Sequence, residues 1–177
     1  ADSNGYYSVE EAIRVGRLLE EYKYGFFEEP VMFDWYEETK QVADALSLPV
    51  AGGEQEYSLH GFRWLIANDG VQVVQPDNYY FGGMIRSIKV ARLAAPFGIT
   101  FVPHITQYGL GYIYMLHCVA VCPNAGKYQE FDLFSTRDAN GNQIPIISKT
   151  TPITSEDGVL PVPTGSGLGI MIDPDYV

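Results

Sequence analysis

The feature that most constrains the fold of this chain is an ionisable residue that recurs every 23 to 27 positions at the end of an apolar segment. Four segments have the length and composition of buried β-strands, at 24–29, 49–54, 71–75 and 99–104, and a shorter fifth runs from 127 to 131. The ionisable residues at these strand ends are Glu28, Glu54, Asp77, His104 and Glu130, and Asp2 precedes them at the same spacing. Acids with only a surface role would be scattered over helices, so the recurrence beside apolar strands indicates a shared function.

Helical patterns separate these strands, at 8–22, 34–46, 58–68, 83–95 and 110–121. Ser8 and Glu11 form a capping-box sequence, Asp34 could open the second helix in a similar way, and Ser58 could cap the third. Alternating strands and helices predict an α/β fold with parallel strands and right-handed crossovers. The alternation alone does not separate an open doubly wound sheet from a barrel.

The strand-end residues favour the barrel. A spacing near 26 residues matches one βα unit of a (β/α)₈ barrel, which has about 250 residues in eight units. Barrel enzymes build their active sites at the carboxyl ends of the strands, where these residues stand. The sequence therefore predicts a partial (β/α)₈ TIM-type barrel over 1–131. From 132 to 177, Gly, Pro, Thr and Ser dominate, which predicts an irregular C-terminal segment with a small hairpin near 153–163.

The formal net charge of −11 argues against nucleic acid as a partner, because phosphate binding needs basic patches. No apolar run approaches the roughly 20 residues that span a bilayer, and no signal peptide opens the chain, so we expect no membrane partner. The two cysteines, Cys118 and Cys122, fit buried free thiols better than a zinc site. Free thiols favour a reduced, cytoplasmic location.

Three of the strand-end carboxylates, Asp2, Glu28 and Glu54, could together hold one hard divalent cation such as Mg²⁺, which prefers oxygen ligands. The alternative for Glu28 is a plain strand exit before Pro30, and Glu29 could support a ligand or form a salt bridge.

Asp77 and His104 come from the next two strands and could form a general base, which later acts as a general acid. His60 and His117 lie in helical patterns and are expected to be structural. Glu130 has apolar neighbours that favour its protonated form, which could donate a hydrogen bond to a developing enolate oxygen. A buried salt bridge is an equally good interpretation of Glu130.

These motifs together resemble the mandelate racemase subgroup of the enolase superfamily. The matching segments are 2–5, 27–30, 52–54, 75–77 with the glycines at 82–83, and 97–99 leading to 103–104. The resemblance implies that Asp2, Glu28 and Glu54 bind Mg²⁺, that Asp77 and His104 are the base, and that Glu130 contacts the substrate carboxylate or enolate. Nearby residues expected to support the ligands or contact substrate are Glu29, Asn4, Glu56 and Gln107.

The resemblance also implies which parts of the family architecture are represented. The chain corresponds to about strands three to eight, and 132–177 is expected to pack on the barrel or on a capping domain. The family's capping domain and the strand that carries a Lys motif have no counterpart here, so the chain resembles a fragment of a longer protein.

The implied activity is Mg²⁺-dependent removal of a proton next to a carboxylate. The leading prediction is an acid-sugar dehydratase, a lyase of carbohydrate acid catabolism that takes a small sugar acid and acts as a homo-oligomer. The alternative is a racemase or epimerase of a 2-hydroxy acid, which needs a second base on the opposite face. A non-catalytic barrel is a third possibility, disfavoured by the intact set of site residues.

Overall fold

A computed structural model describes residues 1–105, 110–131, 155 and 157–171 of the chain. Its sheet has four parallel strands, β1 (Phe27–Glu28), β2 (Val50–Gly52), β3 (Val73–Val74) and β4 (Thr100–Phe101). All four lie inside the predicted segments, but each is only two or three residues long. The register pairs Phe27 with Val50, Ala51 with Val73, and Val74 with Phe101.

The strands are ordered β1-β2-β3-β4 across the sheet, the same as their order in the chain. A doubly wound sheet reverses its strand order near the middle, whereas a barrel adds each strand beside the previous one. Isolated parallel bridges, Asp2 to Glu28 and Phe101 to Ala125, extend the series by one segment on each side. Six consecutive segments therefore wind in one direction, as the barrel prediction requires.

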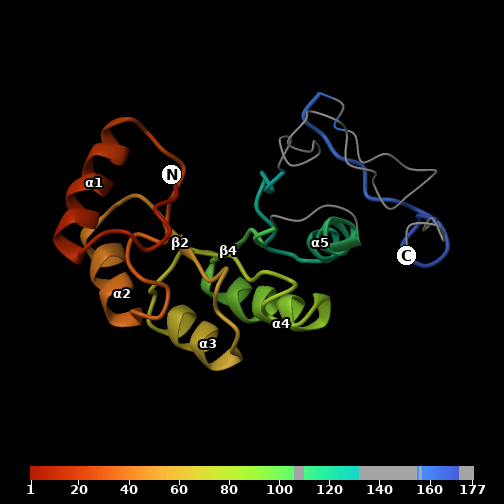
Figure 1. The fold of residues 1–177 in the computed structure, drawn as a ribbon, viewed down its shortest axis with the longest axis horizontal. Helices are drawn as coiled ribbons and strands as arrows, with labels where there is room; N and C mark the ends of the chain where they lie inside the picture. The colour runs from red at the N-terminus through yellow and green to blue at the C-terminus, as the bar shows by residue number, and fades with distance from the viewer. Residues whose placement is uncertain (106–109, 132–154, 156, 172–177) are drawn as a thin grey trace, which may run out of the picture.

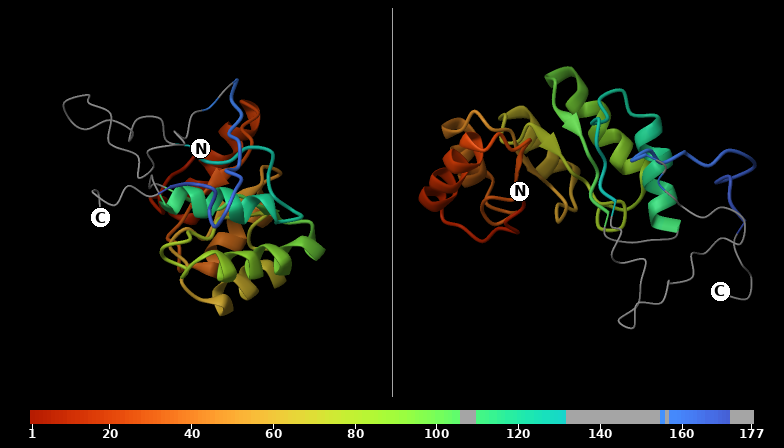
Figure 2. Two further views of the ribbon diagram at one scale, coloured as in Figure 1. Left: turned by 90° about the vertical axis from the view of Figure 1, so that its right-hand side faces the viewer. Right: turned by 90° about the horizontal axis from the view of Figure 1, so that it is seen from above.

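Each strand is followed by a helix. In Figure 1 the helices succeed one another along an arc with the strands on its inner side, and Figure 2 shows the same layering from two further directions. Neighbours along the chain are also neighbours in space, since α1 contacts α2, α2 contacts α3, α3 contacts α4, and α4 contacts α5. The helices are α1 (Val9–Glu21), α2 (Tyr36–Ala45), α3 (Leu59–Ala67), α4 (Met84–Ala94) and α5 (Leu110–Ala120).

The helix caps largely follow the sequence prediction. Ser8 and Glu11 form the predicted capping box at α1, and the Ser58 side chain accepts a hydrogen bond from the Gly61 N–H at α3. The prediction for Asp34 is wrong, because Trp35 is the N-cap of α2 and makes no side-chain hydrogen bond there. The helix α4 runs into a short 3₁₀ turn, η1 (Ala95–Phe97), which ends at Gly98 with φ of 73°.

The main core lies between the sheet and the helices. Four fully buried phenylalanines belong to it, and the rings of Phe62 and Phe81 meet edge to face with centroids 5.0 Å apart. A smaller cluster joins Ile105 to α5, and Leu160 and Val162 of the C-terminal segment pack against it. The domain boundary at 131 stays a prediction.

The predicted strand at 127–131 is wrong. The chain lies beside β4 only near Ala125, where Phe101 exchanges backbone hydrogen bonds with Asn124 (2.8 Å) and Gly126 (2.9 Å). The Gln129 side chain then donates to the Gly126 carbonyl at 2.7 Å, which turns the chain instead of extending it. The predicted hairpin at 153–163 lies partly outside the described residues.

Two further expectations can be compared with the structure. Cys118 and Cys122 are free and buried, as predicted. Among the helices in the described ranges, none has the length and apolar character needed to cross a bilayer.

Candidate active site

The carboxyl ends of the strands surround one cleft with a volume of about 410 Å³. Five of the six residues predicted from spacing line it, namely Asp2, Glu28, Glu54, His104 and Glu130. Asn4, Gln55 and Tyr80 complete the lining. The sixth predicted residue, Asp77, is 2% exposed and lies behind the cleft wall, where it contacts His104. The parallel register thus brings together residues that are 128 positions apart in the chain, from Asp2 to Glu130.

The imidazole of His104 lies between two carboxylates. Its Nδ1 is 2.9 Å from Oδ2 of Asp77, and its Nε2 is 3.3 Å from Oε2 of Glu54. The other oxygen of Asp77 accepts the backbone N–H groups of Tyr79 (2.5 Å) and Tyr80 (3.1 Å), which fixes the carboxylate. Asp77 therefore sets the orientation of the ring, and Nε2 is the nitrogen on the cleft side.

The protonation of His104 reflects this position. Burial by itself would lower the pKa of the imidazole, but the hydrogen bond to Asp77 and the charges of Glu54 and Glu130 outweigh it and raise the pKa to about 9. With Glu54 ionised beside it, the ring is held as an imidazolium, which is a proton donor.

The carboxylates of the cleft also influence one another. Burial, partly offset by the side chain of Gln75, together with the charges of Asp2, Glu54 and Glu130 raises the pKa of Glu28 to about 7. Burial also raises the pKa of Glu54, although the neighbouring His104 opposes the change. Like charges crowded into a partly buried cleft favour a positive ligand, because a cation would remove their repulsion.

The donor set fits Mg²⁺ in chemistry, because Asp2, Glu28 and Glu54 offer only oxygen ligands to one cleft. The side chains are not already converged, however. Within the described ranges, no group of three or more Asp, Glu, His or Cys side chains has an arrangement that could hold a metal. Both oxygens of Asp2 accept hydrogen bonds from Asn4 at 2.9 Å, and each keeps a further lone pair that a cation could use.

Glu130 faces the cleft from the last segment of the series. Its Oε2 accepts the backbone N–H of Ile105 at 2.7 Å, and its backbone carbonyl accepts the Tyr112 hydroxyl at 3.3 Å. The ion pairs found among the described residues do not include Glu130, so the salt-bridge alternative has no partner in that part of the chain.

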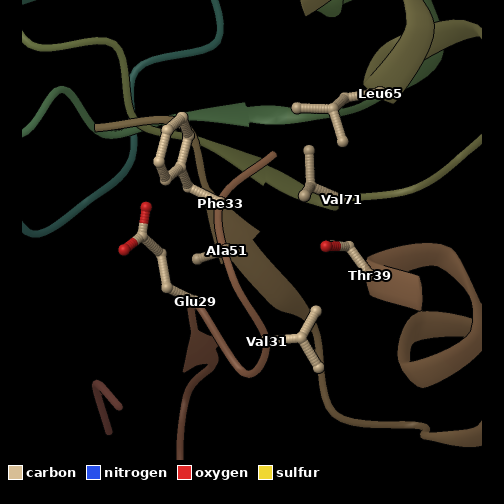
Figure 3. A pocket seen from close by; sticks show the side chains of 9 residues that line it. Glu29, Val31, Phe33, Thr39, Ala51, Leu65 and Val71 are labelled. Carbon is tan, nitrogen blue, oxygen red and sulfur yellow. The ribbon is translucent and has the colours of Figure 1, made fainter. Parts of the chain in front are cut away.

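The additional candidates separate into three groups. Asn4 lines the cleft, and Gln107 lies outside the described residues. Glu56 does not reach the cleft: it is 3% exposed, accepts from the Tyr36 hydroxyl and from the Ser58 N–H, and ties the starts of α2 and α3 together. Glu29 lies behind the wall, in a small hollow where Figure 3 shows it beside Phe33 and Ala51.

Gln55 and Tyr80 were not singled out as site residues from the sequence, although both follow strand ends that carry a predicted residue. Gln55 comes directly after Glu54, and Tyr80 lies three positions after Asp77. Loops at the carboxyl ends of barrel strands build the site, so position alone was the available signal. The two remaining histidines stay outside the cleft: His60 is exposed on α3, and Nε2 of His117 lies 3.0 Å from the Leu168 carbonyl.

Comparison with known proteins identifies the family from which such a site comes. A profile of the family described as "Enolase C-terminal domain-like" matches residues 1–176, which is nearly the whole chain. The arabinonate dehydratase of Saccharolobus solfataricus is 30% identical over 171 residues, which cover 97% of this chain and 44% of that protein. The D-galactarolactone cycloisomerase of Agrobacterium fabrum is also 30% identical and covers 98% and 46%.

The solved structures include a mandelate racemase/muconate lactonizing protein from Paracoccus denitrificans, complexed with magnesium. It is 36% identical, superposes with a TM-score of 0.84, and is matched over 98% of this chain and 44% of its own length. The chain thus spans somewhat less than half the length of each of these proteins.

Proposed function

This chain belongs to the enolase C-terminal domain-like family and is a partial (β/α)₈ barrel, and we propose that it forms most of the active site of a magnesium-dependent acid-sugar dehydratase. The observation that carries the proposal is that His104, held from behind by Asp77, lines one cleft with the carboxylates Asp2, Glu28 and Glu54. The reaction removes the proton next to the carboxylate of a sugar acid and then expels a hydroxyl as water.

Asp2, Glu28 and Glu54 are the residues that would hold Mg²⁺ in the cleft. When bound, the ion supplies Lewis-acid polarisation of the substrate carboxylate. Negative charge develops on that carboxylate as the neighbouring proton leaves, and a group able to donate a hydrogen bond to it favours the transition state. Glu130, which lines the same cleft, is the candidate for that contact.

His104 is the proton-transfer group. Its Nε2 takes the α-proton when the ring is neutral, while Asp77 accepts the Nδ1–H and keeps the ring in place. Neutralising the charge of Glu54 would remove one of the interactions that hold His104 protonated, so a larger fraction of the ring would be neutral. The imidazolium formed by proton abstraction can then protonate the leaving hydroxyl.

Dehydration is preferred to racemisation because of the reactions for which similar proteins are named. Racemisation would need a second base on the face of the substrate carbon opposite His104, and the experiment in D₂O described below tests for one. Relatives near 30% identity are named for dehydration and cycloisomerisation of sugar acids or their lactones. A homo-oligomeric assembly remains a prediction.

The proposal is tested with the complete gene product, Mg²⁺ and a panel of aldonates and aldarates. We expect a 2-keto-3-deoxy acid from at least one member of the panel, and loss of the reaction with EDTA. In D₂O, a racemase would return substrate with deuterium at the α-carbon and inverted configuration and would form no keto acid. That outcome would replace the dehydratase by the racemase.

A further inference from the structure

Glu29 is a buried carboxylate whose position the fold fixes behind the cleft wall. It is 4% exposed and has a φ of 38°, a left-handed conformation that is uncommon for residues other than glycine. Its N–H donates to the Ala51 carbonyl at 3.0 Å, and its carbonyl accepts the Gly5 N–H and the Ser3 hydroxyl, both at 2.8 Å. Such a conformation persists where the surroundings determine it, so the direction of the Glu29 side chain is set by the backbone.

The carboxyl group of Glu29 has one side-chain partner among the described residues. Its Oε2 accepts from Nε2 of Gln55 at 3.2 Å, whereas Oε1 has no hydrogen-bond partner in the same ranges. The hollow around it is lined mainly by apolar side chains, including Val31 and Phe33 (Figure 3). A buried carboxyl group with so few hydrogen bonds destabilises the fold, so its presence calls for an explanation. Its one side-chain contact, with Gln55, indicates where that explanation lies.

Gln55 connects the cleft to the hollow around Glu29. It lines the cleft and Glu29 does not, so the direction from Gln55 to Glu29 leads away from the cleft. With Nε2 bound to Glu29, the carbonyl oxygen Oε1 is the other polar atom of the Gln55 side chain. Among the described residues Oε1 accepts no hydrogen bond and is not one of the buried unpartnered atoms, so it is open to a donor in the cleft that Gln55 lines.

Asn4, which also lines the cleft, shows the same arrangement. Its Nδ2 donates to Oδ2 of Asp2, which leaves its carbonyl oxygen as the remaining polar atom. The wall around the carboxylates thus presents amide carbonyls as acceptors. Beyond a cation, the complementary ligand is a molecule rich in hydroxyl donors.

We infer that Gln55 is a specificity-determining residue, which accepts a hydrogen bond from one hydroxyl group of a polyhydroxylated carboxylate, and that Glu29 is the positioning residue that orients its amide. The inference rests on the proposed function for its choice of ligand. It adds a residue that distinguishes hydroxylated acids from their deoxy analogues, which the proton-transfer chemistry of His104 does not do.

The test compares Gln55→Met with wild type in the complete gene product, on the preferred sugar acid and on analogues that each lack one hydroxyl. One neutral hydrogen bond corresponds to about 2- to 12-fold in kcat/KM, so we expect a loss of that order for Gln55→Met on the full substrate. For one analogue, wild type should show a similar loss, and Gln55→Met should lose nothing further. Gln41→Met, on the exposed face of α2, is the matched control and should change neither value.

Glu29→Gln tests the positioning role. The new amide can donate to Oε1 of Gln55, so the Gln55 side chain can turn and the preference for the hydroxylated substrate should fall, mainly through KM. A merely structural role for Glu29 would lower stability or kcat on all substrates alike. Equal losses for Gln55→Met on every analogue, or no loss on the full substrate, would overturn the inference.

Failure of the proposed function is distinguishable. If wild type dehydrates no sugar acid, the dehydratase proposal falls, and Gln55 is judged by thermal shift with Mg²⁺ and the same acids. Stabilisation of wild type by a hydroxylated acid, reduced in Gln55→Met but not in Gln41→Met, supports the inference. Equal stabilisation of the two variants, or none of wild type, rejects it.

Discussion

Mg²⁺ binding should become tighter as the pH rises from 6 to 8, because the cation and a proton compete for Glu28. In the metal-free cleft the pKa of Glu28 is raised from 4.5 to about 7, with burial as the largest cause. A carboxylate must lose its proton to bind a cation, so each ion bound below pH 7 displaces a proton.

The magnitude follows from that pKa. Glu28 is roughly nine-tenths protonated at pH 6 and one-tenth protonated at pH 8, so the apparent affinity for Mg²⁺ should rise about tenfold across this range. His104 contributes little to the change, because its pKa of about 9 keeps the ring protonated through most of the same range.

The stability of the metal-free protein should change in the opposite direction. The folded state holds the Glu28 proton more tightly than the unfolded chain does, so this contribution is complete below pH 4.5. It is lost as the pH rises toward 7, and added Mg²⁺ should restore stability most strongly at the upper end of that range.

The assay is isothermal titration calorimetry of the complete gene product, at several pH values and in two buffers with different ionisation enthalpies. The buffer pair counts the protons released, about one-half per ion at pH 7 from Glu28 alone. Glu28→Gln should bind Mg²⁺ more weakly and with a smaller pH dependence, and Glu37→Gln on the exposed start of α2 is the control. An affinity independent of pH, or an unchanged slope in Glu28→Gln, would refute the assignment of Glu28 as a ligand.

Two other predictions concern the dyad and the fold. His104→Asn should lower turnover by about 10²–10⁴-fold without loss of Mg²⁺ binding, and Asp77→Asn should lower turnover less. Steady-state kinetics measure the turnover, and calorimetry measures the Mg²⁺ binding. Near-normal dehydration by His104→Asn would mean that another residue is the base. Gly61→Ala should destabilise the protein by about 1–3 kcal/mol in chemical denaturation, because the new methyl would overlap Oε2 of buried Glu56. Gly25→Ala is the control and should leave stability nearly unchanged, because its new methyl has no neighbour within 4 Å. If both variants lost the same stability, the Glu56 side chain would have moved aside to make room for the new methyl.

The sequence was sufficient to predict the fold because its signals are local and repeated. The capping box at Ser8 and the cap at Ser58 mark helix starts by hydrogen bonds within three residues, and both are present. The strand at 127–131 was predicted as a shorter fifth member of the repeated series. Its backbone pairing depends on the position of β4, and that contact is made at Ala125, outside the predicted segment.

The candidate site could be predicted only in part. Spacing identifies residues at strand ends, and two residues identified in this way, Asp2 and Glu130, line the same cleft. Spacing does not give the direction of a side chain just beyond a strand. Glu56 and Gln55 are adjacent in the chain, yet Gln55 faces the cleft and Glu56 turns toward Tyr36, a contact 20 positions away in the sequence.

The two carboxylates beside His104 differ in how readily each can give up its contact with the ring. Asp77 is buried and held by two backbone N–H groups, so its contact with Nδ1 persists whether or not the ring is charged. Glu54 faces the open cleft and has the longer contact, 3.3 Å, so it can exchange the imidazolium for a cation. Under the proposed function, a cation held by Glu54 would weaken the attraction that keeps the ring protonated, and the neutral ring is the form that can accept a proton. Glu54 would therefore couple metal binding to the protonation of His104.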